Sequence, residues 1–253
     1  MQPKTGLNET LALMKDLRLR CEWDAAQTHE SLRPYLIEEA YEVDDAIRAG
    51  DDRLLREELG DLLLQVLFHS VVAEERGAFD FTDVAEGFLA KMKSRHPHLY
   101  EGGEKQSWEG MKAKKRDSIV DGLPADLPAL HRAFRLQDRA AGVGFDWPDA
   151  VGPAAKVEEE LAEVRAEVGR GAAAAGNGVP DPVLEEELGD LLFSVVNLCR
   201  KLGVHPSLAL DKANGKFAGR FQRIEALAKA RGIEVRTAGL EVLDSLWDEV
   251  KKG

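Results

Sequence analysis

The chain has 253 residues, of which 34 are Lys or Arg and 46 are Asp or Glu, so its formal net charge is −12. This acidic balance excludes a chain-wide basic surface for nucleic acid, and a polyanionic ligand would need local cations or a metal ion. Two cysteines cannot form a disulfide framework. The sequence has no signal-peptide core and no run of about 18 apolar residues, so we expect a soluble cytoplasmic protein that binds no membrane.

Apolar residues recur at three- and four-residue spacing, which is the period of an amphipathic helix. In the first half the predicted helices cover roughly residues 6–20, 32–49, 52–76, 82–95 and 108–119. In the second half they cover roughly residues 128–142, 153–169, 182–202, 206–231 and 240–251. No convincing alternating strand pattern separates them, so the sequence predicts an all-α fold.

Two stretches interrupt the helical pattern. Gly122, Pro124 and Pro128 break it between the halves, which predicts domains at residues 1–123 and 124–253. The second stretch, GRGAAAAGNGVPDP from Gly169, is typical of a flexible insertion that lengthens one loop of the second half.

The two halves repeat several motifs in the same order. EELGDLL at Glu57 returns at Glu186, and LIEEAYEV at Leu36 is echoed by VEEELAEV at Val157. This order indicates a tandem duplication of one helical unit. Each half offers few helices with broad apolar faces, so we expect a four-helix-bundle arrangement that a second subunit completes in a homodimer.

Acidic residues in the repeated motifs fall on the inward faces of their predicted helices. At about 100° per residue, Glu58 and Asp61 share the side that continues as apolar core, and Glu39 and Glu42 share one face of the preceding helix. The equivalents in the second half are Glu160, Glu163, Glu187 and Asp190. Gathering carboxylates in a partly buried space is costly without a counter-charge, and oxygen-only ligands suit Mg²⁺ or Mn²⁺.

Two other classes of protein stay open at this point. A carboxylate-bridged di-metal bundle of the di-iron type uses a Glu-x-x-His pattern, whereas here the residue three positions after each inward glutamate is acidic. His69 is therefore interpreted as a core or edge residue. A metal-free helical interaction module would need no carboxylate cluster, and its stability would not respond to Mg²⁺.

The motifs themselves resemble a known family. EEAYE from Glu38 followed by EELGD from Glu57, repeated as EELAE from Glu159 and EELGD from Glu186, resembles the MazG nucleoside triphosphate pyrophosphohydrolases. The resemblance spans nearly the whole chain, including CEWDAAQT, SRHPHLY and KANGKFAGRF. The one departure is Glu22, where the family more often has proline before Trp-Asp.

The resemblance implies an all-α dimer that uses Mg²⁺ to hydrolyse a nucleoside triphosphate between its α and β phosphates. The products would be a monophosphate and pyrophosphate, and the role would be to remove unwanted nucleotides from the pool. The metal ligands that it implies are Glu39, Glu42, Glu58, Asp61, Glu160, Glu163, Glu187 and Asp190.

Phosphate groups also need cations. Lys216 and Arg220 lie at i, i+4 on one predicted helix face, and Lys91 and Arg95 repeat that spacing in the first half. Surface solvation is the alternative for the first-half pair.

The second half carries the fuller polar set, because Lys212 and Asn214 stand where the first half has Gly87 and Leu89. We therefore expect the main active site in the second half. Its expected catalytic residues are Glu160, Glu163, Glu187, Asp190, Lys216 and Arg220. The expected substrate-binding residues are Lys212, Asn214, Lys216, Arg220, Lys91 and Arg95.

Overall fold

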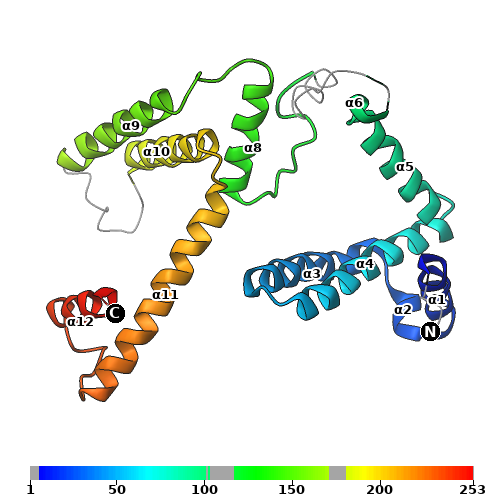
Figure 1. The fold of residues 1–253 in the computed structure, drawn as a ribbon, viewed down its shortest axis with the longest axis horizontal. Helices are drawn as coiled ribbons and strands as arrows, with labels where there is room; N and C mark the ends of the chain where they lie inside the picture. The colour runs from blue at the N-terminus through cyan, green and yellow to red at the C-terminus, as the bar shows by residue number, and fades with distance from the viewer. Residues whose placement is uncertain (1–5, 101, 103–116, 171–180, 253) are drawn as a thin grey trace. The chain divides into compact units, whose positions relative to one another are not determined.

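A computed structural model describes residues 6–100, 102, 117–170 and 181–252, and within these ranges the chain forms helices and loops with no strand. The predicted all-α class is therefore confirmed (Figure 1). The contacts divide the chain into two compact units, Met1–Lys105 and Gln106–Gly253. The domain bounds expected from the sequence, at 123 and 124, stay a prediction.

The helices of the first unit follow the predicted ones closely. They are α1 Leu7–Arg20, α2 Glu22–Ala26, α3 His29–Ala49, α4 Asp52–Glu75, α5 Phe81–Ser94 and α6 Pro97–Tyr100. The short helices α2 and α6 have too few residues to show a helical period, so the sequence pattern did not predict them. Most of the helix predicted at residues 108–119 lies outside the described residues.

The helices of the second unit are α8 Ala129–Gly142, α9 Val151–Gly169, α10 Pro182–Lys201, α11 Pro206–Ala230 and α12 Leu240–Lys252. Most of the expected insertion after Gly169 lies outside the described residues. None of the described helices has both the length and the apolar character needed to span a bilayer.

Side-chain caps determine where the site-bearing helices begin. The hydroxyl of Thr28 accepts a hydrogen bond from the backbone N–H of Ser31 at the start of α3, and Asp51 caps α4 in the same way. Between them Gly50 has φ 66°, a left-handed conformation that ends α3 at low steric cost. This tight turn folds α3 and α4 against each other, and Asp181 caps α10 by accepting from Val183.

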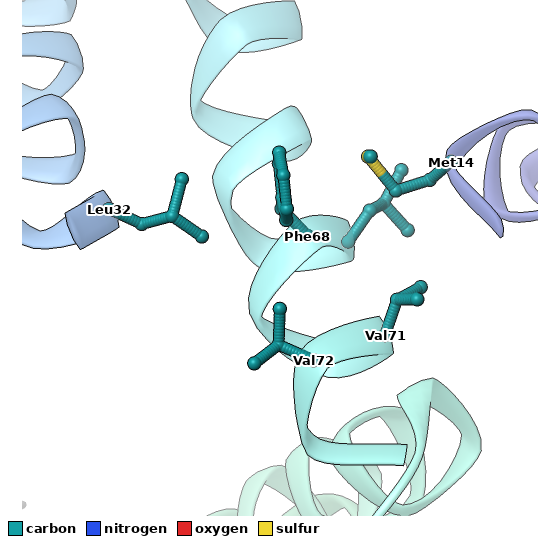
Figure 2. Packing of buried hydrophobic residues seen from close by; sticks show 6 residues of the cluster. Met14, Leu32, Phe68, Val71 and Val72 are labelled. Carbon is teal, nitrogen blue, oxygen red and sulfur yellow. The ribbon is translucent and has the colours of Figure 1, made fainter. Parts of the chain in front are cut away.

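The core of the first unit lies where α1 and α3 meet α4. Met14, Leu32, Phe68, Val71 and Val72 are buried there, as Figure 2 shows. Burying side chains of this size contributes about 1.5–3 kcal/mol each. The middle of α4 is therefore buried in the core, packed against α1 and α3.

In the second unit, α10 packs against α8 and α9, while α11 and α12 form a separate small core. The guanidinium of buried Arg139 on α8 donates to the carbonyl oxygens of Ile119 at 2.8 Å and Asp121 at 2.9 Å. These contacts attach the segment before α8 to that helix.

Candidate functional site

Acidic residues of α3 and α4 converge in the first unit. Carboxylate oxygens of Glu39, Glu58 and Asp61 lie within 4.8 Å of one another. Burial and the neighbouring charges of Asp61 and Glu42 raise the pKa of Glu39, and burial followed by Glu42 and Asp61 raises the pKa of Glu58. All four sequence-predicted carboxylates therefore interact in the folded unit.

The second unit repeats this arrangement on α9 and α10. Carboxylate oxygens of Glu160, Glu163 and Glu187 lie within 4.8 Å of one another. Asp190 follows Glu187 by one helical turn and lines the same cavity as Glu160. Of these four side chains only Glu160 is buried in the single chain, so the group is more open than the sequence suggested.

One cation of the second unit was missed by sequence reasoning. Lys156 lies one turn before Glu160 on α9, with its Nζ 2.5 Å from that carboxylate and 2.8 Å from Glu159. The hydrogen bond from Lys156 outweighs burial and lowers the pKa of Glu160. A hydrogen bond with Glu160, together with burial and nearby charges, raises the pKa of Glu163. The i, i+4 spacing of Lys156 and Glu160 was the available sequence signal.

Both acidic groups have the chemistry of a site for a hard divalent cation. Every candidate ligand is a carboxylate oxygen, which Mg²⁺, Mn²⁺ and Ca²⁺ prefer. Burial is the main cause of the raised pKa of Glu39 and Glu58, and a hydrogen bond with Glu160 is the main cause for Glu163. Repulsion from neighbouring carboxylates adds to all three shifts, and a bound cation would relieve that repulsion. Neither group of described residues includes histidine, so the Glu-x-x-His pattern of di-iron bundles has no counterpart here.

A cavity of about 550 Å³ opens beside the acidic group of the second unit. It lies among α8, the loop that follows it, α9 and α10, which are drawn from green to yellow in Figure 1. Glu160 and Asp190 belong to its wall, so the cavity and the acidic group are continuous. Its remaining lining residues are Ile119, Leu136, Gln137, Ala140, Phe145, Trp147, Pro153, Lys156, Phe193, Ser194, Asn197 and Arg200.

The corresponding part of the first unit is filled by core. Counting from the shared EELGD motif, Phe68 stands at the position of Asn197, and Val71 stands at the position of Arg200. Phe68 and Val71 are only 2% and 4% exposed and belong to the hydrophobic core in Figure 2. The polar cavity wall of α10 is therefore replaced on α4 by packed apolar side chains.

The structure does not place the predicted substrate-binding residues of α11 in this cavity. Lys212, Asn214 and Lys216 are exposed on α11, and Arg220 lies over the ring of Trp247 at 5.7 Å from the ring centre. None of them lines the cavity. In the first unit, Lys91 lies in the last turn of α5 and Arg95 is the residue that ends that helix.

Comparisons with known proteins agree with these features. The MazG nucleotide pyrophosphohydrolase domain matches residues 27–100. The nucleoside triphosphate pyrophosphohydrolase/pyrophosphatase MazG of Thermotoga maritima is 44% identical over 255 residues, which cover 97% of this chain and 95% of that protein. The nucleoside triphosphate pyrophosphohydrolase of Escherichia coli K12 is 42% identical over 263 residues, 97% of each chain. The chain therefore belongs to the MazG nucleotide pyrophosphohydrolase family.

Proposed function

We propose that the protein hydrolyses nucleoside triphosphates between the α and β phosphates with Mg²⁺, releasing a nucleoside monophosphate and pyrophosphate and so removing unwanted nucleotides from the pool. The names of its full-length relatives support the substrate class. The observation that carries the proposal is the cavity of the second unit, whose wall includes two residues of the acidic group, Glu160 and Asp190. A triphosphate needs both a cation site and an adjoining space for its nucleoside.

Glu160, Glu163, Glu187 and Asp190 would hold the metal ion in the second unit. Bound there, Mg²⁺ would supply charge neutralisation and orientation of the phosphates, and Mn²⁺ would be a possible substitute. Lys156 pairs with Glu160 and adds positive charge to the cavity wall. A carboxylate oxygen that is free of metal would orient a water molecule for attack at the α phosphorus, since phosphoryl transfer depends on positioning and charge stabilisation.

We infer that the second unit is the main active site and that the first unit has a structural or regulatory role. The first acidic group has the same donor atoms, yet the space beside it is occupied by Phe68 and its neighbours. A metal ion could bind there without room for a nucleoside. This contrast extends the sequence argument, which rested on the richer polar set of the second half.

A homodimer would complete the site. Large apolar side chains are exposed on α3 and α10, including Ile37 at 57%, Tyr41 at 63% and Leu192 at 59%. Such surfaces are typical of interfaces rather than of free helices. Because the polar side chains of α11 lie outside the cavity of their own chain, we propose that Lys212, Asn214, Lys216 and Arg220 contact the phosphates and sugar across a dimer. In the first unit, Lys91 and Arg95 would be limited to phosphate groups, because the space beside that acidic group is filled by core.

Product analysis tests the reaction. The full chain is incubated with ATP and MgCl₂, and the products are separated by ion-exchange chromatography. We expect AMP and pyrophosphate in equal amounts, and no turnover when EDTA removes the metal. ADP with orthophosphate would contradict cleavage between the α and β phosphates.

A further inference from the structure

The cavity of the second unit contains a glutamine whose amide orientation is determined by its neighbour. Nε2 of Gln137 donates to the carbonyl oxygen of Phe193 at 2.8 Å, so the other end of the amide must be the Oε1 acceptor. Gln137 is only 7% exposed, and its Oε1 has no hydrogen-bond partner among the described residues. A buried acceptor without a donor is unfavourable, so this atom favours a ligand that carries an N–H group.

Asn197 supplies the opposite group on the same cavity wall. Its Oδ1 accepts a hydrogen bond from Nε of Arg200 at 3.0 Å, which leaves its Nδ2 as a donor. Asp146 holds Arg200 through an ion pair, and the pKa of Asp146 is lowered because hydrogen bonds from Arg200 and Lys201 outweigh its burial. Both amides are thus oriented before any ligand binds, one presenting an acceptor and the other a donor.

The remaining walls suit a flat aromatic ligand. Phe145, Trp147 and Phe193 line the cavity, and these residues are between 40% and 80% exposed, so the wall offers aromatic side chains on which a base can stack. The volume of about 550 Å³ lies within the range of small-molecule sites. Glu160 at the same cavity places the acidic group next to whatever binds there.

We propose that this cavity binds the base of the nucleoside triphosphate and that Gln137 and Asn197 determine specificity by contacting the base's Watson–Crick edge. For adenine, the N6 amino group donates to Oε1 of Gln137, and N1 accepts from Nδ2 of Asn197. Cytosine offers the same order of groups through its N4 amino group and N3, whereas uracil and guanine carry the donor and acceptor in exchanged order and would set donor against donor. The site therefore favours adenine and cytosine and rejects an alkylated edge. This inference rests on the proposed function, since it assigns part of the same substrate.

A comparison of two ligands with two proteins tests the contact. Calorimetry with the full chain and Mg²⁺ measures the Kd of α,β-methylene ATP and of the matching purine riboside triphosphate, which lacks only the amino group. We expect the wild-type protein to bind the purine riboside analogue about tenfold more weakly, the loss typical of one buried hydrogen bond. Gln137→Met should bind α,β-methylene ATP about tenfold more weakly and should no longer distinguish the two ligands.

Gln65→Met is the matched control. Gln65 on α4 is 4% exposed and also has an unpartnered Oε1, but it lies in the first unit, so its replacement should leave the wild-type ratio of the two Kd values unchanged. Equal wild-type affinity for both ligands, no binding of either, or a retained ratio in Gln137→Met would overturn the proposal. If Gln137→Met does not fold, the two wild-type affinities decide. Failure of the proposed function is separate, because it appears as analogue binding without release of pyrophosphate from ATP.

Discussion

The Nζ atom of Lys156 lies 2.5 Å from Oε1 of Glu160, the one buried carboxylate of the second acidic group. This pair offsets part of the negative charge before any metal binds. Lys156→Met should therefore raise the pKa of Glu160 and lower the Tm of the metal-free protein, while Mg²⁺ should restore more of the Tm than in the wild type. Because a cation of the cavity wall is also lost, KM for ATP should rise by about tenfold or more.

Thermal unfolding with EDTA and with MgCl₂ checks this prediction. Lys156→Arg keeps the charge and should retain most of the metal-free Tm. An unchanged metal-free Tm in Lys156→Met would mean that Glu160 does not depend on this partner.

The two acidic groups should differ in their importance for turnover. Glu187→Gln with Asp190→Asn should lower kcat for ATP by at least about 100-fold, because electrostatic stabilisation of the reacting phosphates is lost. Glu58→Gln with Asp61→Asn should leave kcat within about threefold of the wild type, since the adjoining space in the first unit is filled. Circular dichroism and sedimentation confirm that both variants fold and assemble. The reverse pattern of rates would assign the active site to the first unit.

Much of the site's backbone arrangement followed from the sequence. Counting about 100° per residue placed Glu39 and Glu42 on one face of their helix and Glu58 and Asp61 on one face of the next, and carboxylate oxygens of Glu39, Glu58 and Asp61 do converge. The start of α3 was misplaced, because Thr28 caps the helix at His29 rather than near residue 32. The helical period identifies which side chains share a face, and caps refine where that face begins.

The cavity could not be predicted in the same way, because it depends on how much space the side chains of three helices leave between them. Its sequence signal was a polar residue, Asn197, inside the apolar run LLFSVVNLC, where the first copy has Phe68. The position of Lys216 and Arg220 relative to the acidic group could not be predicted either. A helical period shows which residues share a face of one helix, but not where that helix lies against the others.

The exposed apolar surface of α3 and α10 should be covered by a second copy of the chain. Sedimentation equilibrium at micromolar concentration should give about twice the chain mass of 27.8 kDa. Leu192→Glu should shift the protein toward monomer, because a buried, unpaired charge at an interface is strongly unfavourable. Leu19→Glu replaces a leucine that is 86% exposed on α1 and should remain dimeric. A wild-type monomer under these conditions would refute the dimer.

The acidic group of the first unit should make stability depend on pH and metal together. The folded-state pKa values of Glu39 and Glu58 are raised above 4.5. Their contribution to stability is therefore fully present below pH 4.5 and is lost as pH rises through the raised values. Because a metal ion binds the deprotonated carboxylates, the rise in Tm caused by Mg²⁺ should grow over the same pH interval.

Differential scanning calorimetry across this interval, with and without Mg²⁺, measures both effects. Glu58→Gln with Asp61→Asn should raise the metal-free Tm at neutral pH and reduce its dependence on pH. A Mg²⁺ effect on Tm that is the same at every pH would contradict the coupling.

A close contact between Gly152 and Trp147 supports the cavity wall. A Cβ atom built on Gly152 would lie 2.1 Å from a ring carbon of Trp147, much closer than real atoms approach. Gly152→Ala must therefore displace the indole from its position beside the cavity. The displacement should raise KM for nucleoside triphosphates by about three- to tenfold with little change in kcat, because binding is weakened equally in the ground and transition states.

Gly87→Ala on α5, where an added Cβ meets no atom within 4 Å, is the matched control and should be as active as the wild type and slightly more stable. Steady-state kinetics and Trp147 fluorescence, measured in a background where the other tryptophans are phenylalanine, follow the ring and the rate together. An unchanged KM with a displaced indole would show that Trp147 does not contact the nucleotide.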